Sequence, residues 1–530
     1  MSVQLSRTLI FLAVPLGFGS LALLLGMDAN WDLRNYHYYN AWAFLQNRYD
    51  LDFLVAQIPT FYNPIPDIPY YFLTQNMPAA NVAFVLGVAA GLNVILLTLL
   101  GEELLLITHP GKKLAMATFL ALAGCCGAIS LSEVGTVFYD NILSLGLISS
   151  LLLLVKHWQA LAQSKPAQAV GLGLLAGLPV GFSFGLKQST VMFPVALCLG
   201  LLFTLESRWP RRFLASFTFG LGVLAGMLAG GGYWLWHLWQ AYGNPTFPYF
   251  NQIFQSPWGL PQDYRDTQYL PHDFWQRLIF PFTFTLNSRA TGEIDFRDLR
   301  ILLAYILIPF AGFCRFWRPT PYGQDFTRQG PAMLVMLGAS IAYLLWLKMF
   351  AIYRYILSLE MLAPLLVALA IDRLPIQRAR KLALAIALAM LALVTTEPGH
   401  WIRVPFSNRA VEVNSPGFSD AAHTIVVLAG HEPLSFLLPS LPAESRFLRI
   451  DSTFTNPDET SLRFNKVMAE IIGSHTGPLL TLFINSERPD VVRRLLAYNL
   501  TIAEKPCEQL TSPIGAAPYE LCPLSRVLTQ

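Results

Sequence analysis

Long apolar stretches recur along the chain up to about residue 396. An α-helix rises about 1.5 Å per residue, so about 17 to 25 apolar residues cross the roughly 30 Å of hydrocarbon in a bilayer. Stretches of this kind, some slightly shorter, lie at residues 8–26, 81–101, 114–131, 140–155, 169–186, 188–205, 213–238, 300–314, 331–347, 354–371 and 382–396. They predict a polytopic α-helical membrane protein with about eleven transmembrane helices.

The pattern changes after residue 396 to shorter apolar runs separated by ordinary polar sequence. Residues 424–429, 446–450 and 479–484 are typical of short buried strands, and residues 464–472 and 489–498 of amphipathic helices. We therefore predict two domains: a transmembrane module over residues 1–396 and a small α/β domain over residues 397–530.

Composition agrees with a membrane protein, because 54% of the residues are hydrophobic and only 13% are charged. The net charge of +3 is too small and too dispersed to indicate a nucleic-acid partner. We find no nucleotide-binding glycine loop, metal-type cysteine spacing or long internal repeat, which argues against an ATP-driven pump.

Basic residues predict the orientation, since Lys and Arg are retained on the cytoplasmic side. With a cytoplasmic N-terminus, all five inside loops are basic, from Lys112 and Lys113 in the first loop to Lys381 in the last. An odd number of spans then puts the loops 27–80 and 240–299 and the C-terminal domain outside the cytoplasm. We expect a multi-pass protein of the plasma (inner) membrane. If the spans on either side of Lys187 merged into one re-entrant feature, all later loops would be inverted.

Six cysteines fall into two groups. Four lie in predicted spans, where a buried thiol behaves as a small hydrophobe: Cys125, Cys126, Cys198 and Cys314. Cys507 and Cys522 lie in the C-terminal domain, where an oxidising compartment would permit a disulfide that closes a loop of about 15 residues.

The candidate chemistry begins just after the first span. Asp28, Asp32, Tyr36 and Asn40 are four residues apart, so on a helix they would share one face that is too polar for lipid. An alternative is an interfacial helix whose aromatic residues form a belt beside solvated acids. A carboxylate such as Asp32 at the membrane face is also suited to act as a general base.

A proline-rich segment follows. Three prolines between Pro64 and Pro69 predict a rigid, non-helical return to the membrane. It is either only the entry to the second span or the wall of an active-site cavity, in which Tyr62, Asn63 and Asp67 supply polar groups.

These features resemble the GT-C superfamily of integral-membrane glycosyltransferases. The Asp32 to Tyr36-His37 pattern and the Asn63-Pro64 segment carry the resemblance, which covers about residues 1–396. It implies a GT-C-like fold and transfer of a hexose or pentose, with inversion, from a polyprenyl-phosphate sugar to an extracytoplasmic lipid, glycan or protein acceptor of the cell envelope. It also implies a catalytic carboxylate in the first outside loop, for which Asp32 fits best and Asp28 competes.

Such a reaction also needs cations for the donor phosphate. Arg354, in Tyr353-Arg-Tyr, matches an Arg-Tyr pair that many GT-C members use for this purpose, and a guanidinium holds phosphate bidentately. Lys187, between two spans, is the second candidate, although both residues also fit simple anchors at the membrane surface.

Further polar residues are candidates for substrate contacts. These are Tyr36, His37, Asn63, Glu133, Asp140, His272 and Arg289. Paired carboxylates such as Glu133 and Asp140 suit a divalent metal or acceptor hydroxyls. Members that use monosaccharide-phosphate lipids resemble metal-independent enzymes, so we predict no metal and no other cofactor.

Two other functions stay open. A non-enzymatic lipid or polysaccharide transporter, or flippase, would need ionisable residues deep within the spans, whereas here they cluster toward one membrane face. A structural subunit whose C-terminal domain binds a partner is the other alternative.

Overall fold

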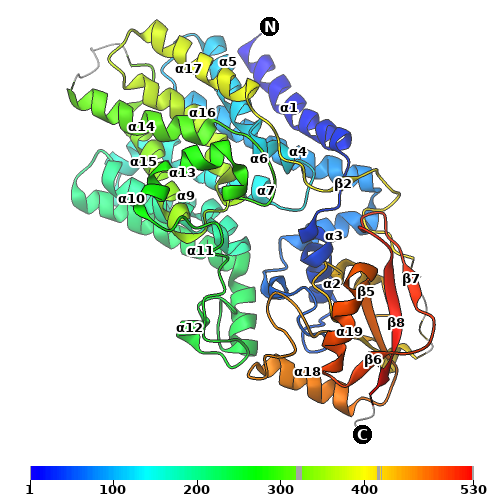
Figure 1. Ribbon diagram of the computed structural model, residues 1–530. Helices are drawn as coiled ribbons and strands as arrows, with labels where there is room; N and C mark the ends of the chain where they lie inside the picture. The colour runs from blue at the N-terminus through cyan, green and yellow to red at the C-terminus, as the bar shows by residue number, and fades with distance from the viewer. Residues whose placement is uncertain (1, 318–324, 415–417, 419, 528–530) are drawn as a thin grey trace. The chain divides into compact units, whose positions relative to one another are not determined.

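The computed structural model describes residues 2–317, 325–414, 418 and 420–527, and it is mostly helical with a small C-terminal sheet (Figure 1). The chain forms two compact units. The first comprises Met1–Leu24, Phe84–Gly232 and Asp266–Trp401, and the second comprises Leu25–Ala83, Tyr233–Arg265 and Ile402–Gln530. These units are defined by packing; the division after residue 396, which concerns the membrane boundary, stays a prediction.

Seven segments in the described part of the chain are long and apolar enough to cross a membrane. They are α1 (Val3–Leu25), α4 (Ala79–Leu104), α9 (Pro166–Leu186), α11 (Trp209–Tyr242), α14 (Arg300–Trp317), α15 (Gln329–Met349) and Tyr353–Asp372, which contains α16 (Leu357–Asp372). The other predicted spans lie largely on α5 (Pro110–Cys125), α7 (Asp140–Lys156), α10 (Met192–Thr204) and α17 (Arg378–Val394). These helices agree with a multi-pass membrane protein. The number of eleven spans stays a prediction.

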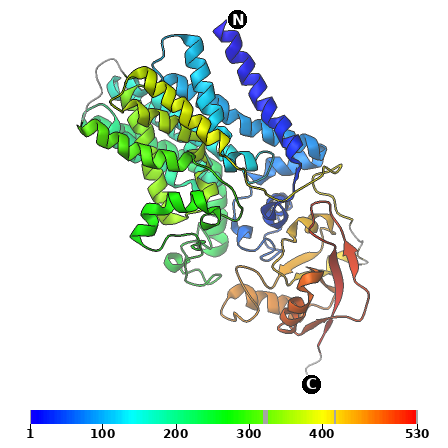
Figure 2. The same cartoon turned by 45° about the horizontal axis from the view of Figure 1, so that its top comes forward.

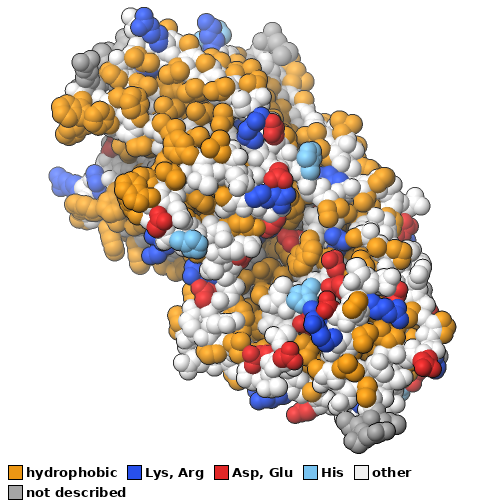
Figure 3. Space-filling model, viewed as in Figure 1, with side chains coloured by type: hydrophobic (Ala, Val, Ile, Leu, Met, Phe, Trp, Pro, Cys, Tyr) orange, Lys and Arg blue, Asp and Glu red, His pale blue; other side chains and the backbone are white. Residues whose placement is uncertain are grey.

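Close helix packing organises the first unit, whose long helices lie side by side in Figure 2. Helix α16 contacts α5, α7, α14, α15 and α17. Glycines allow the backbones to approach, since a Cβ on Gly124 would lie 1.9 Å from the carbonyl oxygen of Met361. On the face drawn in Figure 3, hydrophobic side chains gather over these helices, as expected of a surface in lipid.

The chain breaks between α9 and α10. Lys187 is extended, and a 3₁₀ turn, η3 (Gln188–Thr190), follows it before α10 begins. The segments on either side of Lys187 are thus two separate helices; that each of them spans the membrane stays a prediction.

A buried carboxylate on α16 holds the short helix α6 (Ala128–Ser132). Glu360 accepts hydrogen bonds from the backbone N–H of Ile129 at 3.2 Å and from the N–H and hydroxyl of Ser130 at 2.9 and 2.8 Å. Glu360 thus accepts from N–H groups in the first turn of α6, which have no partner within the helix. Glu360 therefore fixes the segment that leads into Glu133.

The C-terminal part of the second unit is an α/β sheet with the strand order β4-β3-β5-β8-β6. Its strands are β3 (Ile425–Leu428), β4 (Arg446–Arg449), β5 (Leu479–Ile484), β6 (Leu500–Ile502), β7 (Glu508–Leu510) and β8 (Tyr519–Arg526); β3 is parallel to β4 and β5, and β8 is antiparallel to its partners. Helices α18 (Arg463–Ser474) and α19 (Arg488–Leu496) complete it. The structure confirms the three predicted strands and both predicted helices and adds β6, β7 and β8.

The loop at residues 27–80 covers the edge of this sheet. Phe53 pairs with strand β4: its N–H donates to Phe447 and its carbonyl accepts from the N–H of Arg449, both at 3.0 Å. An uncovered edge strand would expose unpaired N–H and C=O groups. Residues 48–57 thus belong to the same packed unit as the sheet.

A buried ion pair holds that loop in place. Arg48 binds the Asp52 carboxylate at 2.5 and 2.7 Å and donates to the carbonyls of Ala443 and Ser445 at 2.5 and 2.6 Å. Asp52 also accepts from the N–H of Phe447 at 3.0 Å. Both side chains are almost completely buried, at 3% and 4% exposure, so these bonds replace water entirely.

Two local expectations are wrong. Asp28 does not share a helix face with Asp32, because β1 (Met27–Asp28) pairs with β2 (Arg403–Val404). The return to the membrane is not extended throughout, because α3 (Asp67–Asn76) begins inside the proline-rich segment. Pro69 lies in the first turn of this helix, where no N–H donor is needed.

Exposed aromatics do not form the alternative belt. The alternative would need exposed aromatic side chains in the segment from Trp31 to Trp42. Trp31 is exposed, but Tyr38, Tyr39 and Trp42 on α2 (Tyr38–Leu45) are buried within the second unit. This part of the loop at residues 27–80 is therefore protein core.

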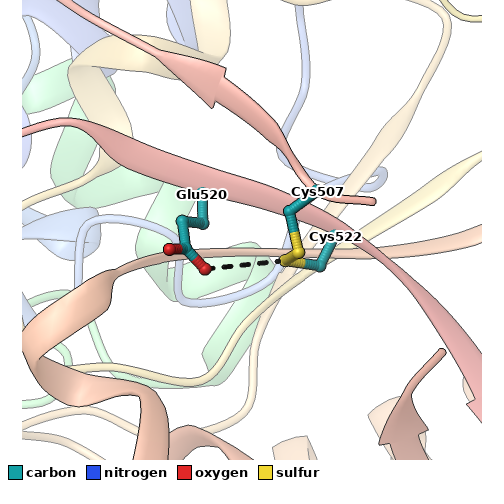
Figure 4. A group of neighbouring side chains, drawn as sticks. All are labelled: Cys507, Glu520 and Cys522. Atoms are coloured by element: carbon teal, nitrogen blue, oxygen red, sulfur yellow. Dashed lines mark hydrogen bonds between the residues drawn. A yellow bond between two sulfur atoms is a disulfide. The ribbon is translucent and has the colours of Figure 1, made fainter. Parts of the chain in front are cut away.

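Cys507 and Cys522 form a disulfide, as the sequence predicts (Figure 4). Glu520 lies beside it, with Oε2 3.9 Å from Sγ of Cys522. While the bond is intact, neither sulfur can serve as a thiolate ligand for a metal.

Replacing Arg48 with alanine leaves Asp52 buried without its cation, which costs about 3 to 5 kcal/mol of unfolding free energy. We expect a lower midpoint in a thermal melt of the purified protein followed by tryptophan fluorescence. Arg493→Ala is the control, because its pair with Asp490 is exposed and contributes little. Equal midpoints for the two variants would contradict the role of the buried pair.

Thiol labelling of the protein purified from its membrane tests the disulfide and its compartment. In the denatured protein we expect two further cysteines, Cys507 and Cys522, to react only after reduction. The cytoplasm keeps such pairs reduced. Full labelling without a reductant would place the domain there.

Candidate functional site

The first unit brings four of the predicted site residues into one electrostatic group. Glu133 directly follows α6, Asp140 is the first residue of α7, Lys187 follows α9, and Arg354 lies in the 3₁₀ turn η5 (Tyr353–Ile356) that leads into α16. All four are therefore at the ends of apolar helices. We call them the Glu133 cluster.

Lys187 is held within this cluster. Its Nζ lies 2.8 and 2.9 Å from the two carboxylate oxygens of Asp140 and 3.4 Å from the carbonyl oxygen of Phe138. The ring of Tyr355 lies 5.4 Å from the same nitrogen. The lysine side chain retains 26% exposure, so it is anchored yet accessible to a ligand.

Arg354 lies against two aromatic rings. Its guanidinium carbon lies 4.3 Å from the ring centre of Phe138 and 5.4 Å from that of Trp401. Glu293 is 3.8 Å away, too far for a strong charge-assisted hydrogen bond. Cation–π contacts orient the guanidinium.

Glu133 is the buried member of the cluster. Glu133 is 3% exposed, and neither of its carboxylate oxygens has a hydrogen-bond partner among the described residues. Burial raises the pKa of Glu133 well above its usual value, and the negative charge of Asp140 raises it further, against the opposing effect of Arg354 and Lys187. With Glu133 uncharged, the cluster holds the cations Lys187 and Arg354 and the anion Asp140, and the Glu293 carboxylate lies 3.8 Å from Arg354.

The second unit contains the other predicted group: Asp32 directly precedes the five-residue π-helix η1 (Leu33–His37), and Tyr36 and His37 lie on it. Tyr36 donates its hydroxyl to the Asp32 carboxylate at 3.2 Å, so the predicted four-residue spacing does bring these side chains together. Short π-helical segments are frequent at functional sites. Asp32 is partly exposed and therefore accessible to an acceptor hydroxyl.

His37 pairs with a carboxylate from the proline-rich segment. Its Nδ1 lies 2.5 Å from Oδ1 of Asp67, and both side chains are buried. The rings of Tyr36 and His37 are 4.0 Å apart. Asn63 accepts from the N–H of Ile65 at 3.1 Å and so shapes the turn before α3.

Asp28 and Asp32 differ in their surroundings. Asp28 is buried, and its two oxygens accept hydrogen bonds from the N–H and the side-chain amide of Asn30, at 3.0 and 2.9 Å. These bonds stabilise the carboxylate within a local turn. The partly exposed Asp32 is thus the better candidate for a base.

His272 and Arg289 lie near the two ends of α13 (Phe274–Leu286) in the first unit. The N–H of His272 donates to Gln276, and Arg289 forms an exposed ion pair with Asp295 at 2.8 Å. Their contact with substrate stays a prediction.

Phe138 and Trp401 are the residues that sequence reasoning missed. They lie against Arg354 and contact each other at 4.5 Å, and Trp401 donates to the hydroxyl of Ser132. The sequence signal for Trp401 was its position as an aromatic residue just beyond the last predicted span. Its contacts could not be predicted, because its partners are more than 40 residues away in the sequence.

Comparisons of the chain with models of known protein families, with curated proteins and with solved structures found no match. Function is therefore inferred from the residues of this chain and their arrangement.

The raised pKa of Glu133 makes stability depend on pH. Because the folded protein binds this proton more tightly than the unfolded chain does, the free energy of unfolding falls as the pH rises above the usual value of 4.5 toward the raised pKa. Glu133→Gln removes this fall, so the variant gains stability relative to the wild type with increasing pH. Thermal melts between about pH 5 and about pH 8 measure the difference.

Glu444→Gln, at an exposed position, is the control and should follow the wild-type profile. A constant difference between Glu133→Gln and the wild type across this pH range would mean that Glu133 does not bind the extra proton.

Proposed function

We propose that the protein is a GT-C-type membrane glycosyltransferase that moves a sugar from a polyprenyl-phosphate donor to an extracytoplasmic acceptor. The observation that carries this proposal is the pair of anchored cations, Lys187 and Arg354, in the cluster at the ends of apolar helices. A lipid-linked phosphate combines an apolar chain with an anionic group, so these surroundings suit it.

The distance between Arg354 and its neighbouring carboxylate supports phosphate binding. Its carboxylate neighbour Glu293 is 3.8 Å away, whereas charge-assisted hydrogen bonds are about 2.7 to 2.9 Å long. A phosphate at that shorter distance would bind the guanidinium more strongly than Glu293 does. Lys187 would add a second positive charge while keeping its contact with Asp140.

Glu133 fits the same ligand. A neutral carboxyl group donates one hydrogen bond, and its oxygens have no hydrogen-bond partner among the described residues. It would donate to an oxygen of the phosphate, whose negative charge an ionised carboxylate would repel.

In the proposed reaction, Asp32 acts on the acceptor. The acceptor hydroxyl gives its proton to the Asp32 carboxylate while its oxygen forms a bond to the anomeric carbon. The bond between that carbon and the donor phosphate breaks, and the lipid phosphate leaves with the electron pair as an anion that Lys187 and Arg354 stabilise. Attack from the opposite face inverts the anomeric configuration.

Two further observations support this proposal. The disulfide in the C-terminal region suits an extracytoplasmic location. The buried Glu360 of α16 is satisfied by α6, so it serves packing rather than an ion pathway, which weighs against the rival transporter or flippase.

Sugar transfer tests the proposal. Membranes that contain the wild type or Asp32→Asn, at matched levels, are incubated with a panel of radiolabelled polyprenyl-phosphate sugars. We expect transfer from at least one donor, and a loss of roughly 10² or more in Asp32→Asn, because an amide cannot accept the proton.

Asp50→Asn is the control, since Asp50 is an exposed carboxylate of the same loop that remains outside the proposed site. Transfer that survives in Asp32→Asn would reject Asp32 as the base. No transfer from any donor would reject the glycosyltransferase and favour the transporter.

A further inference from the structure

Helix α13 carries a row of exposed hydrophobic side chains in the first unit. They are Phe274, Trp275, Leu278, Ile279, Phe282 and Leu286, with exposures from 44% to 89%. At 3.6 residues per turn, these positions occupy a continuous arc of about 140° on one side of the helix. A patch of this kind on a surface in water would be unfavourable and marks a site of interaction.

The opposite side of α13 packs on helices that are long enough to cross a membrane. Phe280 and Phe284 are buried, and their rings lie 6.0 and 6.2 Å from that of Trp346 on α15. Tyr305 on α14 donates its hydroxyl to the carbonyl of Leu278 at 2.8 Å. The exposed row is therefore on a helix attached directly to α14 and α15.

The length of α13 excludes a further span. Its 13 residues extend about 20 Å, less than the roughly 30 Å of bilayer hydrocarbon. It begins with an Asp273 cap, whose side chain accepts from the N–H of Gln276, so its N-terminus is adapted to a polar environment. Aromatic residues such as Trp275 are enriched where membrane and water meet.

We infer that α13 lies along the membrane–water interface with this hydrophobic row in the lipid. The bilayer is the occupant that the attachment to α14 and α15 favours, because both helices are long and apolar enough to cross a membrane and most of the apolar window of α14 is not buried in the protein. Amphipathic helices of this type insert their apolar face roughly 5 to 10 Å into the boundary between headgroups and acyl chains.

This anchor bears on the segment that carries Arg354. After α13 and the 3₁₀ turn η4 (Ser288–Ala290), the carbonyl of Thr291 accepts from the N–H of Tyr353 at 2.8 Å. The rings of Phe284 and Tyr353 are 5.5 Å apart. Lipid contact by α13 therefore fixes the depth of a turn that adjoins the Glu133 cluster, whatever reaction that cluster serves.

Spin labels on the full chain in lipid vesicles test the inference. The free cysteines Cys125, Cys126, Cys198 and Cys314 are replaced by alanine, the disulfide is kept, and Ile279→Cys is compared with Gln276→Cys. Gln276 is exposed on the same helix but outside the hydrophobic row. We expect the label at position 279 to collide more with oxygen than with a water-soluble nickel complex, and the label at position 276 to do the reverse.

Free collision of the position 279 label with nickel would overturn the inference, because the row would face water. Shielding from both reagents would overturn it as well, since a second copy or another part of this chain would then cover the row. If the alanine background does not fold, brominated phospholipids replace the labels: they must quench more emission in the wild type than in Trp275→Phe. Equal quenching would again contradict lipid contact.

Discussion

The second unit depends on the buried ion pair between Arg48 and Asp52. This pair fixes the loop at residues 27–80 along strand β4, although the two are almost 400 residues apart in the sequence. Other bonds then hold the segment that carries Asp32: Arg34 binds Tyr519, the hydroxyl of Ser435 donates to the carbonyl of Asn35, and Gln57 donates to the carbonyl of His431. The C-terminal sheet is thus part of the support of Asp32. Removing it would expose the partners of the π-helix and alter fold and function together.

In the first unit, charged groups lie at the ends of apolar helices, and their surroundings hold them there. Lys187 is balanced by Asp140, and Arg354 lies against aromatic rings. The carboxylate oxygens of Glu133 have no hydrogen-bond partner among the described residues, and burial raises the pKa of this group, which favours its uncharged form and lowers the cost of a buried charge. The same arrangement that lowers this cost leaves hydrogen-bonding capacity for an anionic ligand.

Features set by neighbouring residues could be predicted from the sequence, and those set by distant contacts could not. Apolar runs gave the helices, and the four-residue spacing of Asp32 and Tyr36 gave their contact, because both depend on local periodicity. Asp28 was misplaced because its strand partner, Arg403, comes from the far end of the chain. Strands β6 and β7 have only three residues each, too few for an alternating pattern to appear. Phe138 and Trp401 meet Arg354 only through tertiary packing.

The central claim is that Lys187 and Arg354 bind the phosphate of a lipid. The most direct test is an electron cryo-microscopy structure of the full chain in lipid nanodiscs with added polyprenyl phosphate. The account predicts phosphate oxygens about 3 Å from the guanidinium of Arg354 and from Nζ of Lys187, with Glu133 facing the ligand. Phosphate bound elsewhere, with Arg354 still enclosed by Phe138 and Trp401 and no ligand beside it, would contradict the account.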